Sequence, residues 1–283
     1  MEDIPLVHSE REIAMTVKTT DNKELCDYKC LKRCLLLETV IQTRISEKIG
    51  HELEDMIKPA NIEIGIVIHE IGSLLFYAKL KKTLIESAEI FGSSEIECAK
   101  FLLSRCIRLC NEPERTYLNF LLVAAFLKES VYYCVLKYKC YRMLYIGDFC
   151  FDVLYNRLFR KVFESRKVYE KLELFCKAFL EYFTPGTTQD EFQGSAFGKY
   201  WTDYVEKIFN VNNDSFSLTE SEVEFFEKFY SIENYANHEE WPVLHETENT
   251  EYYFDAREHY PSDCETCGSK CFDYLNYVNT VKK

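Results

Sequence analysis

The residue types best suited to bind a metal lie close together near the end of the chain. His259, Cys264, Cys267 and Cys271 follow one another in one short segment. Zinc takes four sulfur or nitrogen ligands in a tetrahedron, and a Cys-x2-Cys turn supplies two of them. This spacing predicts one structural zinc ion. The alternative is that these are free thiols, because a single Cys-x2-Cys is weaker than two such pairs. A redox role has less support, because no βαβ pattern surrounds the motif.

No other group of residues indicates catalysis. His69 and Glu70 are adjacent in the apolar segment 64–72, but no second histidine lies four positions after the first, as a metalloprotease helix requires. Glycine-rich phosphate loops and the Gly-x-Ser-x-Gly turn of serine hydrolases do not occur in the sequence. We therefore expect a protein that is not an enzyme, with His69 as a partly buried structural residue.

Charge is unevenly distributed along the chain. The 283 residues contain 34 Lys and Arg against 47 Asp and Glu, a formal net charge of −13. Residues 214–265 contain 15 of the acidic residues and only two basic ones, so this segment carries the whole excess. Binding to nucleic acid in general needs clustered basic residues, and binding to an anionic membrane is disfavoured for the same reason. The aromatic-rich acidic segment suits docking on a basic partner or on the chain's own lysines near residues 79–82.

The sequence also indicates a cellular compartment. The first residues lack the basic and apolar regions of a secretory signal, and the longest apolar run, Phe120 to Leu127, is far shorter than a membrane span. We expect a cytoplasmic protein, with the nucleus as the other possibility. Disulfides are not expected there. The ten cysteines from Cys26 to Cys176 are therefore interpreted as small buried thiols.

Apolar spacing predicts helices. Glycine and proline are scarce, at nine and six residues, and turns between strands would need more of them. Apolar residues recur at the helical period within 97–111, 129–148 and 168–183. Breaks in the pattern include 184–193 and 210–217, and Ser217 with Glu220 predicts a capping box at the start of a helix.

Together these patterns predict an all-α protein. We expect an antiparallel bundle of about nine helices over residues 1–241. A separate acidic, aromatic-rich tail with its cysteines is expected over residues 242–283.

Several short segments, in order, resemble the 14-3-3 proteins, which are helical dimers that bind phosphoserine peptides. Glu70-Ile71-Gly72-Ser73 is similar to the family's Val-Val-Gly-Ala, and Leu109-Cys110-Asn111-Glu112 to its Ile-Cys-Asn-Asp. Leu136-Lys137-Tyr138-Lys139 followed by Tyr145-Ile146-Gly147-Asp148-Phe149 gives the best match. The likeness covers about residues 1–241.

The departures from that family concern its phosphate pocket. The family's lysine and two arginines fall on Ile68, Leu75 and Leu144, its tyrosine is kept as Tyr145, and its asparagine falls on Gly198. A phosphate dianion needs charge-assisted donors, so phosphate dependence is expected to be lost. A one-turn shift of the alignment would bring in Lys79 or Arg142, but not the full set of donors. These positions would instead form an apolar ligand groove.

The resemblance implies a non-enzymatic adaptor or scaffold that binds a protein or peptide, in the form of a homodimer. The alternative is a stoichiometric structural or regulatory factor of a large assembly, such as a ribonucleoprotein, anchored by the zinc-ordered tail.

Overall fold

A computed structural model of the chain describes residues 28–42, 62–77, 79–80, 82, 94–110, 116–138, 140–209 and 216–230. Every regular element within these ranges is a helix and none is a strand, which confirms the all-α prediction for this part of the chain. The predicted tail of residues 242–283 lies outside the described residues. With it lie the four predicted zinc ligands, His259, Cys264, Cys267 and Cys271.

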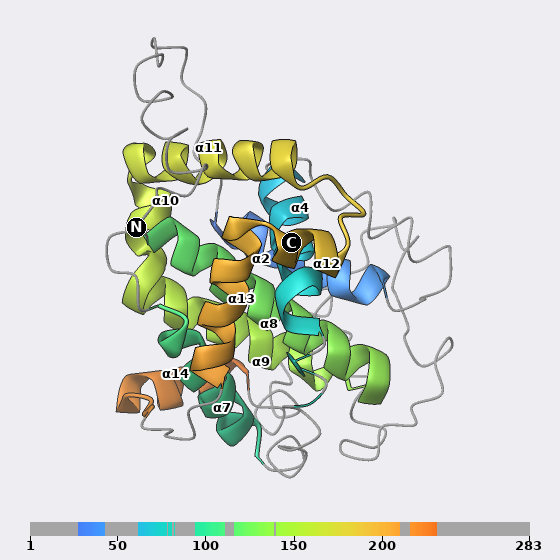
Figure 1. The fold of residues 1–283 in the computed structure, drawn as a ribbon. Coiled ribbons are helices and arrows are strands. Elements are labelled where there is room, and N and C mark those ends of the chain that lie inside the picture. Colours follow the sequence, from blue (N-terminus) through green and yellow to red (C-terminus); the bar gives the residue numbers. More distant parts are fainter. Residues whose placement is uncertain are drawn as a thin grey trace, which may run out of the picture.

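The helices of the described ranges are drawn in Figure 1. In chain order they are α2 (Tyr28–Ile41), α4 (Ile62–Ile71), the π-helix η1 (Gly72–Phe76), α7 (Glu95–Arg108), α8 (Thr116–Tyr138), α9 (Arg142–Leu154), the π-helix η2 (Tyr155–Phe159), α10 (Arg160–Glu164), α11 (Arg166–Tyr182), α12 (Gln189–Gly194), α13 (Ala196–Phe209) and α14 (Glu220–Phe229).

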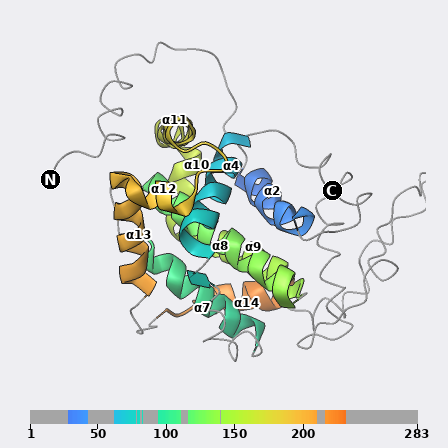
Figure 2. The same ribbon diagram turned by 45° about the vertical axis from the view of Figure 1, so that its right-hand side comes forward.

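Helix α8 occupies the centre of the arrangement. It packs against α2, α4, η1 and α9, while α11 lies at one end of the molecule and α7 and α14 lie at the other (Figures 1 and 2). The segment Thr116–Lys137 is long and apolar enough to cross a membrane by length and composition alone, but 94% of its most apolar window is buried inside the protein. Such burial is what a central core helix shows.

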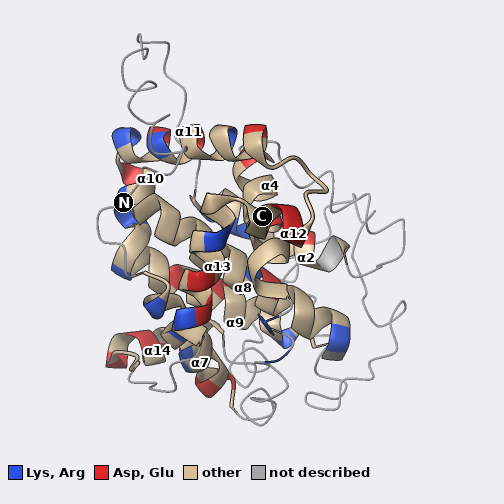
Figure 3. Ribbon diagram, viewed as in Figure 1, with Lys and Arg blue, Asp and Glu red and all other residues tan. Residues whose placement is uncertain are grey.

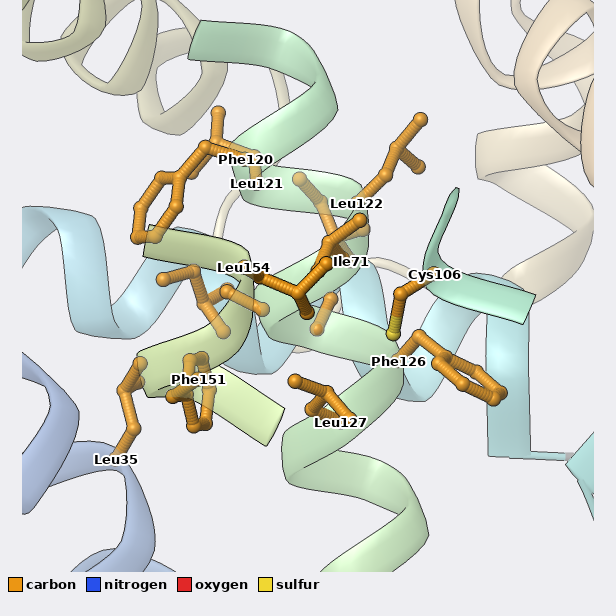
Figure 4. Close-up of a cluster of buried hydrophobic side chains, with 14 of the residues drawn as sticks. Leu35, Ile71, Cys106, Phe120, Leu121, Leu122, Phe126, Leu127, Phe151 and Leu154 are labelled. Carbon is orange, nitrogen blue, oxygen red and sulfur yellow. The ribbon is translucent and has the colours of Figure 1, made fainter. Parts of the chain in front are cut away.

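The apolar core surrounds α8. Ile71, Leu122 and Leu154 come from three different elements and converge in the close-up of Figure 4. At one edge, the ring of Phe120 packs edge-on against Phe159 and Phe163, with ring centroids 5.5 and 5.0 Å apart. The distant elements α8, η2 and α10 are held together by these contacts.

Two of the predicted helical stripes are confirmed. In α7 the residues Phe101, Leu102 and Cys106 are buried, and Ser94 caps its first turn by accepting the Glu97 N–H at 3.3 Å. In α11 a buried stripe faces the core (Leu172, Phe175, Cys176 and Phe179). The outer side of α11 carries interspersed acidic and basic residues, visible in Figure 3.

Other boundaries were predicted wrongly. The stripe at 129–148 is not one helix, because α8 ends at Tyr138 and α9 begins at Arg142. No glycine or proline marks this break, and so the apolar period runs through it. The predicted capping box at Ser217 lies two residues too early, since Thr219 caps α14 with Glu222. The predicted break at 184–193 contains the start of α12, which Thr188 and Glu191 cap in the same way.

The described cysteines carry free thiols, as predicted. Cys98, Cys106, Cys134, Cys140, Cys150 and Cys176 are buried, and Cys30, Cys34 and Cys110 are partly buried. Burial raises the pKa of Cys98 and of Cys110 to about 12. These thiols therefore stay protonated and poorly reactive at neutral pH.

Candidate functional site

The structure places the predicted groove residues in the interior. Ile68 and Leu144 have no exposed surface, Leu75 is 3% exposed, and Tyr145 and Gly198 are buried too. Helix α8 packs against both α4, which carries Ile68, and α9, which carries Leu144, whereas α4 and α9 do not pack extensively on each other. In this arrangement the predicted positions supply core contacts and offer no surface to a ligand.

Gly198 has a packing role at the junction of α12 and α13. A Cβ atom there would lie 1.9 Å from the carbonyl oxygen of Phe192, so only glycine fits. The Gly198 N–H donates to the Ser195 hydroxyl at 2.9 Å, which helps to start α13. The position sets how closely the two helices approach.

Lys79 and Arg142, the two basic residues that a shifted alignment would bring into a phosphate pocket, also have structural roles. The Lys79 ammonium lies 3.2 Å from Glu206 and donates to the Thr202 carbonyl at 3.5 Å, which ties it to α13. Arg142 is buried at the start of α9.

A different group of residues has the features of a site. Glu129 of α8 is only 3% exposed, and no hydrogen-bond or ion-pair partner for its carboxylate occurs among the described residues. Tyr132 and Leu136 follow it on the same side of α8, and Tyr77, which comes directly after η1, lies close to Tyr132. We name the surface formed by Glu129, Tyr132, Leu136 and Tyr77 the Glu129 face.

Local geometry explains why Glu129 is enclosed. A Cβ atom on Gly72 would lie 2.6 Å from Cγ and 2.9 Å from Oε1 of Glu129, so the glycine lets the η1 backbone approach the carboxylate closely. Gly72 is also the first residue of the π-helix, a feature frequent at functional sites. By contrast Gly65, on the same segment, has open space around it.

Burial dominates the electrostatics of Glu129. It raises the pKa of this carboxyl to about 7, although the neighbouring Lys128 acts in the opposite direction. Lys128 has its ammonium 2.6 Å from the Glu38 carboxylate of α2 and is fully buried. It is therefore already paired.

Helix α4, which packs against α8, carries two further titratable residues, His69 and Glu70. Burial and then Lys128 lower the pKa of His69, so its imidazole is largely neutral at pH 7. Burial raises the pKa of Glu70, and Lys128 opposes this rise. Neither group supplies a positive charge to Glu129.

The rim of the Glu129 face is aromatic and apolar. Tyr77 is 48% exposed and Leu136 is 39% exposed. Burial, then Glu129, then Tyr77 raise the pKa of Tyr132, so Tyr132 lies close to both Glu129 and Tyr77. The arrangement can hold a cation or a hydrogen-bond donor against Glu129 and an apolar surface against the rim.

No group of three or more His, Cys, Asp or Glu side chains able to hold an ion occurs among the described residues. The Glu129 face also has no serine, cysteine or lysine arranged with a base as a nucleophile would need.

A second buried charge cluster provides a comparison. The Lys32 ammonium lies 2.8 Å from Asp148 and 2.6 Å from Asp152, and the Tyr230 hydroxyl donates to Asp152 at 2.6 Å. We name these four residues the Lys32 cluster; it joins α2, α9 and α14.

Sequence reasoning missed Glu129. A signal was present, because Lys128, Glu129 and Ser130 are three polar residues in the middle of an otherwise apolar segment. Such an interruption in a central helix indicates buried polar groups, which are frequent at functional sites.

Comparison with protein-family models, with curated proteins and with solved structures found no match. The resemblance to 14-3-3 proteins therefore stays a prediction based on the short segments quoted above.

Proposed function

We propose that this chain is a non-enzymatic helical scaffold that binds a protein partner through the Glu129 face. One observation carries the proposal: large apolar side chains are exposed beside a buried carboxylate that has no partner among the described residues. Tyrosine is enriched at the centres of protein interfaces, because its ring buries area and its hydroxyl still hydrogen-bonds.

The test is capture of partners by the full chain and by two matched variants. Tyr77→Ser combined with Leu136→Ser should abolish capture of a specific, stoichiometric partner, identified by mass spectrometry. Tyr182→Ser is the control, since Tyr182 is 61% exposed but lies on α11. Equal capture by all three proteins, or no stoichiometric partner at all, would reject the proposal. Co-sedimentation only with a large particle would favour the assembly-factor alternative.

We also propose that partner binding does not depend on phosphate, as the 14-3-3 resemblance with its departures implies. Ile68, Leu75 and Leu144 are apolar and buried, so they offer no charge-assisted donor to a phosphate. A phosphoserine peptide and its unphosphorylated counterpart should bind equally weakly in a calorimetric titration. Clear preference for the phosphopeptide would contradict this. The resemblance also implies a homodimer, and the molar mass from light scattering on the same samples tests this proposal.

A further inference from the structure

We propose that the Glu129 face receives a lysine or arginine side chain of the partner protein, with the cation against the Glu129 carboxylate and its aliphatic stem against Tyr77, Tyr132 and Leu136. This inference rests on the proposed function and adds the chemistry of the residue that is recognised.

The Glu129 carboxylate is buried and lacks a partner among the described residues. A buried carboxylate is costly to keep unless it is paired or hydrogen-bonded. Among the described residues, Glu129 has neither kind of partner, although only 3% of its surface is exposed. Its close approach to Gly72 leaves no room on that side for a side chain to reach it. A partner for the carboxylate is therefore absent from the described residues, and we take it to come from the bound protein.

The charge around Glu129 is mainly negative. The neighbouring carboxylates are those of Glu38 and Glu70, and the only described ammonium close by is Lys128, which is paired with Glu38. Three carboxylates thus share one lysine. A cation is the group that this surface lacks.

The rim of the Glu129 face suits the stem of a basic side chain. Lysine and arginine have long aliphatic stems that pack on apolar surface while the charged end is held elsewhere. The exposed Leu136 and Tyr77 provide such a surface. A cation over a tyrosine ring gains further attraction, which the rings of Tyr77 and Tyr132 offer.

The chain's own acidic segment does not fit this face. Residues 214–265 carry 15 acidic residues and two basic ones, so their net charge has the same sign as the face. Like charges repel, and so a second molecule of opposite local charge is the better occupant.

The titration of Glu129 gives the interaction a pH dependence. Its pKa of about 7 in the unbound protein means that a bound cation, which favours the carboxylate, displaces a proton near neutral pH. Binding should therefore strengthen as the pH rises from about 6 to about 8. Among the described residues, the other titratable or charged groups around Glu129 are Glu38 of α2, His69 and Glu70 of α4, Tyr77 after η1, and Lys128 and Tyr132 of α8.

The experiment titrates the full chain with two capped tripeptides and follows backbone amide shifts by NMR. One probe is acetyl-Leu-Arg-Leu-amide, and the other replaces arginine by the isosteric, uncharged citrulline. We expect saturable shifts around Glu129 with the arginine probe only. Glu129→Gln should weaken that binding by about tenfold or more, the usual loss for a hydrogen bond to a charged group. Glu224→Gln, at an exposed carboxylate on α14, is the control and should leave it unchanged.

The outcomes separate this inference from the proposed function. If the arginine probe does not bind, binds no better than the citrulline probe, or binds the Glu129→Gln variant equally well, the inference is overturned. The proposed function then still stands or falls on the Tyr77 and Leu136 variant. Because glutamine has the shape of glutamate, a thermal melt is expected to show that the variant is folded.

Discussion

Helix α2 contributes to two buried charge clusters that are built differently. Near its start, Lys32 lies between Asp148 and Asp152, and Tyr230 donates to Asp152. Near its end, Glu38 pairs with Lys128, but the adjacent Glu129 has no partner among the described residues. Both clusters join α2 to neighbouring helices, and only the first is closed.

The difference shows how burial and pairing compete. Burial lowers the pKa of Lys32, but the two aspartates outweigh this effect and raise it, so the lysine is held charged. For Glu129 burial wins and raises the pKa. A fully paired cluster indicates a structural role, whereas a buried group held away from its ordinary pKa indicates a functional candidate.

The largest predicted effect is at the Lys32 cluster. Lys32→Met removes the cation from two largely buried aspartates, and breaking such a pair from one side destabilises a protein by about 4 kcal/mol. Urea unfolding of the full chain should show this loss in the free energy of unfolding. Lys100→Met is the control, because the pair of Lys100 with Glu97 is exposed and should contribute less than about 1 kcal/mol. Similar losses in both variants would contradict the structural role of the cluster.

Glu129→Gln should have the next largest effect on the free energy of unfolding, and this substitution should stabilise the protein above pH 7. The folded protein keeps Glu129 protonated up to about pH 7, whereas the unfolded chain releases this proton near 4.5. Between these values the folded state holds more protons, so native stability falls as the pH rises and is lowest above pH 7. Glutamine cannot ionise. The stability of the variant relative to the native chain should therefore increase by about 3 kcal/mol between roughly pH 4 and pH 8. Urea unfolding of both proteins at several pH values tests this prediction. A difference in unfolding free energy that does not change with pH would show that Glu129 is not desolvated.

Gly72→Ala tests the close approach that encloses Glu129. The new Cβ would lie 2.6 Å from Glu129 Cγ, and the resulting overpacking should destabilise the protein by about 2 kcal/mol. Gly65→Ala has open space and should instead stabilise the helix by about 0.5–1 kcal/mol. Shortening the acid in a Gly72→Ala, Glu129→Ala double variant should recover part of the loss. Additive effects in this double-mutant cycle would mean that the two residues do not touch.

The sequence allowed the class of fold to be predicted, because scarce glycine and the helical period of residues such as Phe101, Leu102 and Cys106 are local properties. It did not reveal the break between Tyr138 and Arg142, since no residue there is a helix breaker and tertiary packing decides the boundary. The candidate site was missed because Gly72 and Glu129 are 57 positions apart in the numbering and meet only in the folded chain. Burial of Ile68 and Leu144 likewise depends on the position of α8, which periodicity does not specify.

Tyr230→Phe should have the smallest effect on the free energy of unfolding. It tests a single hydrogen bond of the Lys32 cluster, whereas Lys32→Met removes the charge of the cluster. The substitution keeps the ring against Phe149, 5.5 Å between centroids, and deletes only the hydroxyl that donates to Asp152. Lys32 still pairs with Asp152, so one hydrogen bond is lost and no charge is left alone. The expected destabilisation is about 1 kcal/mol in urea unfolding. Tyr182→Phe, at an exposed tyrosine of α11, should change the stability much less. A loss with Tyr230→Phe as large as that with Lys32→Met would mean that docking of α14, rather than charge pairing, holds the Lys32 cluster together.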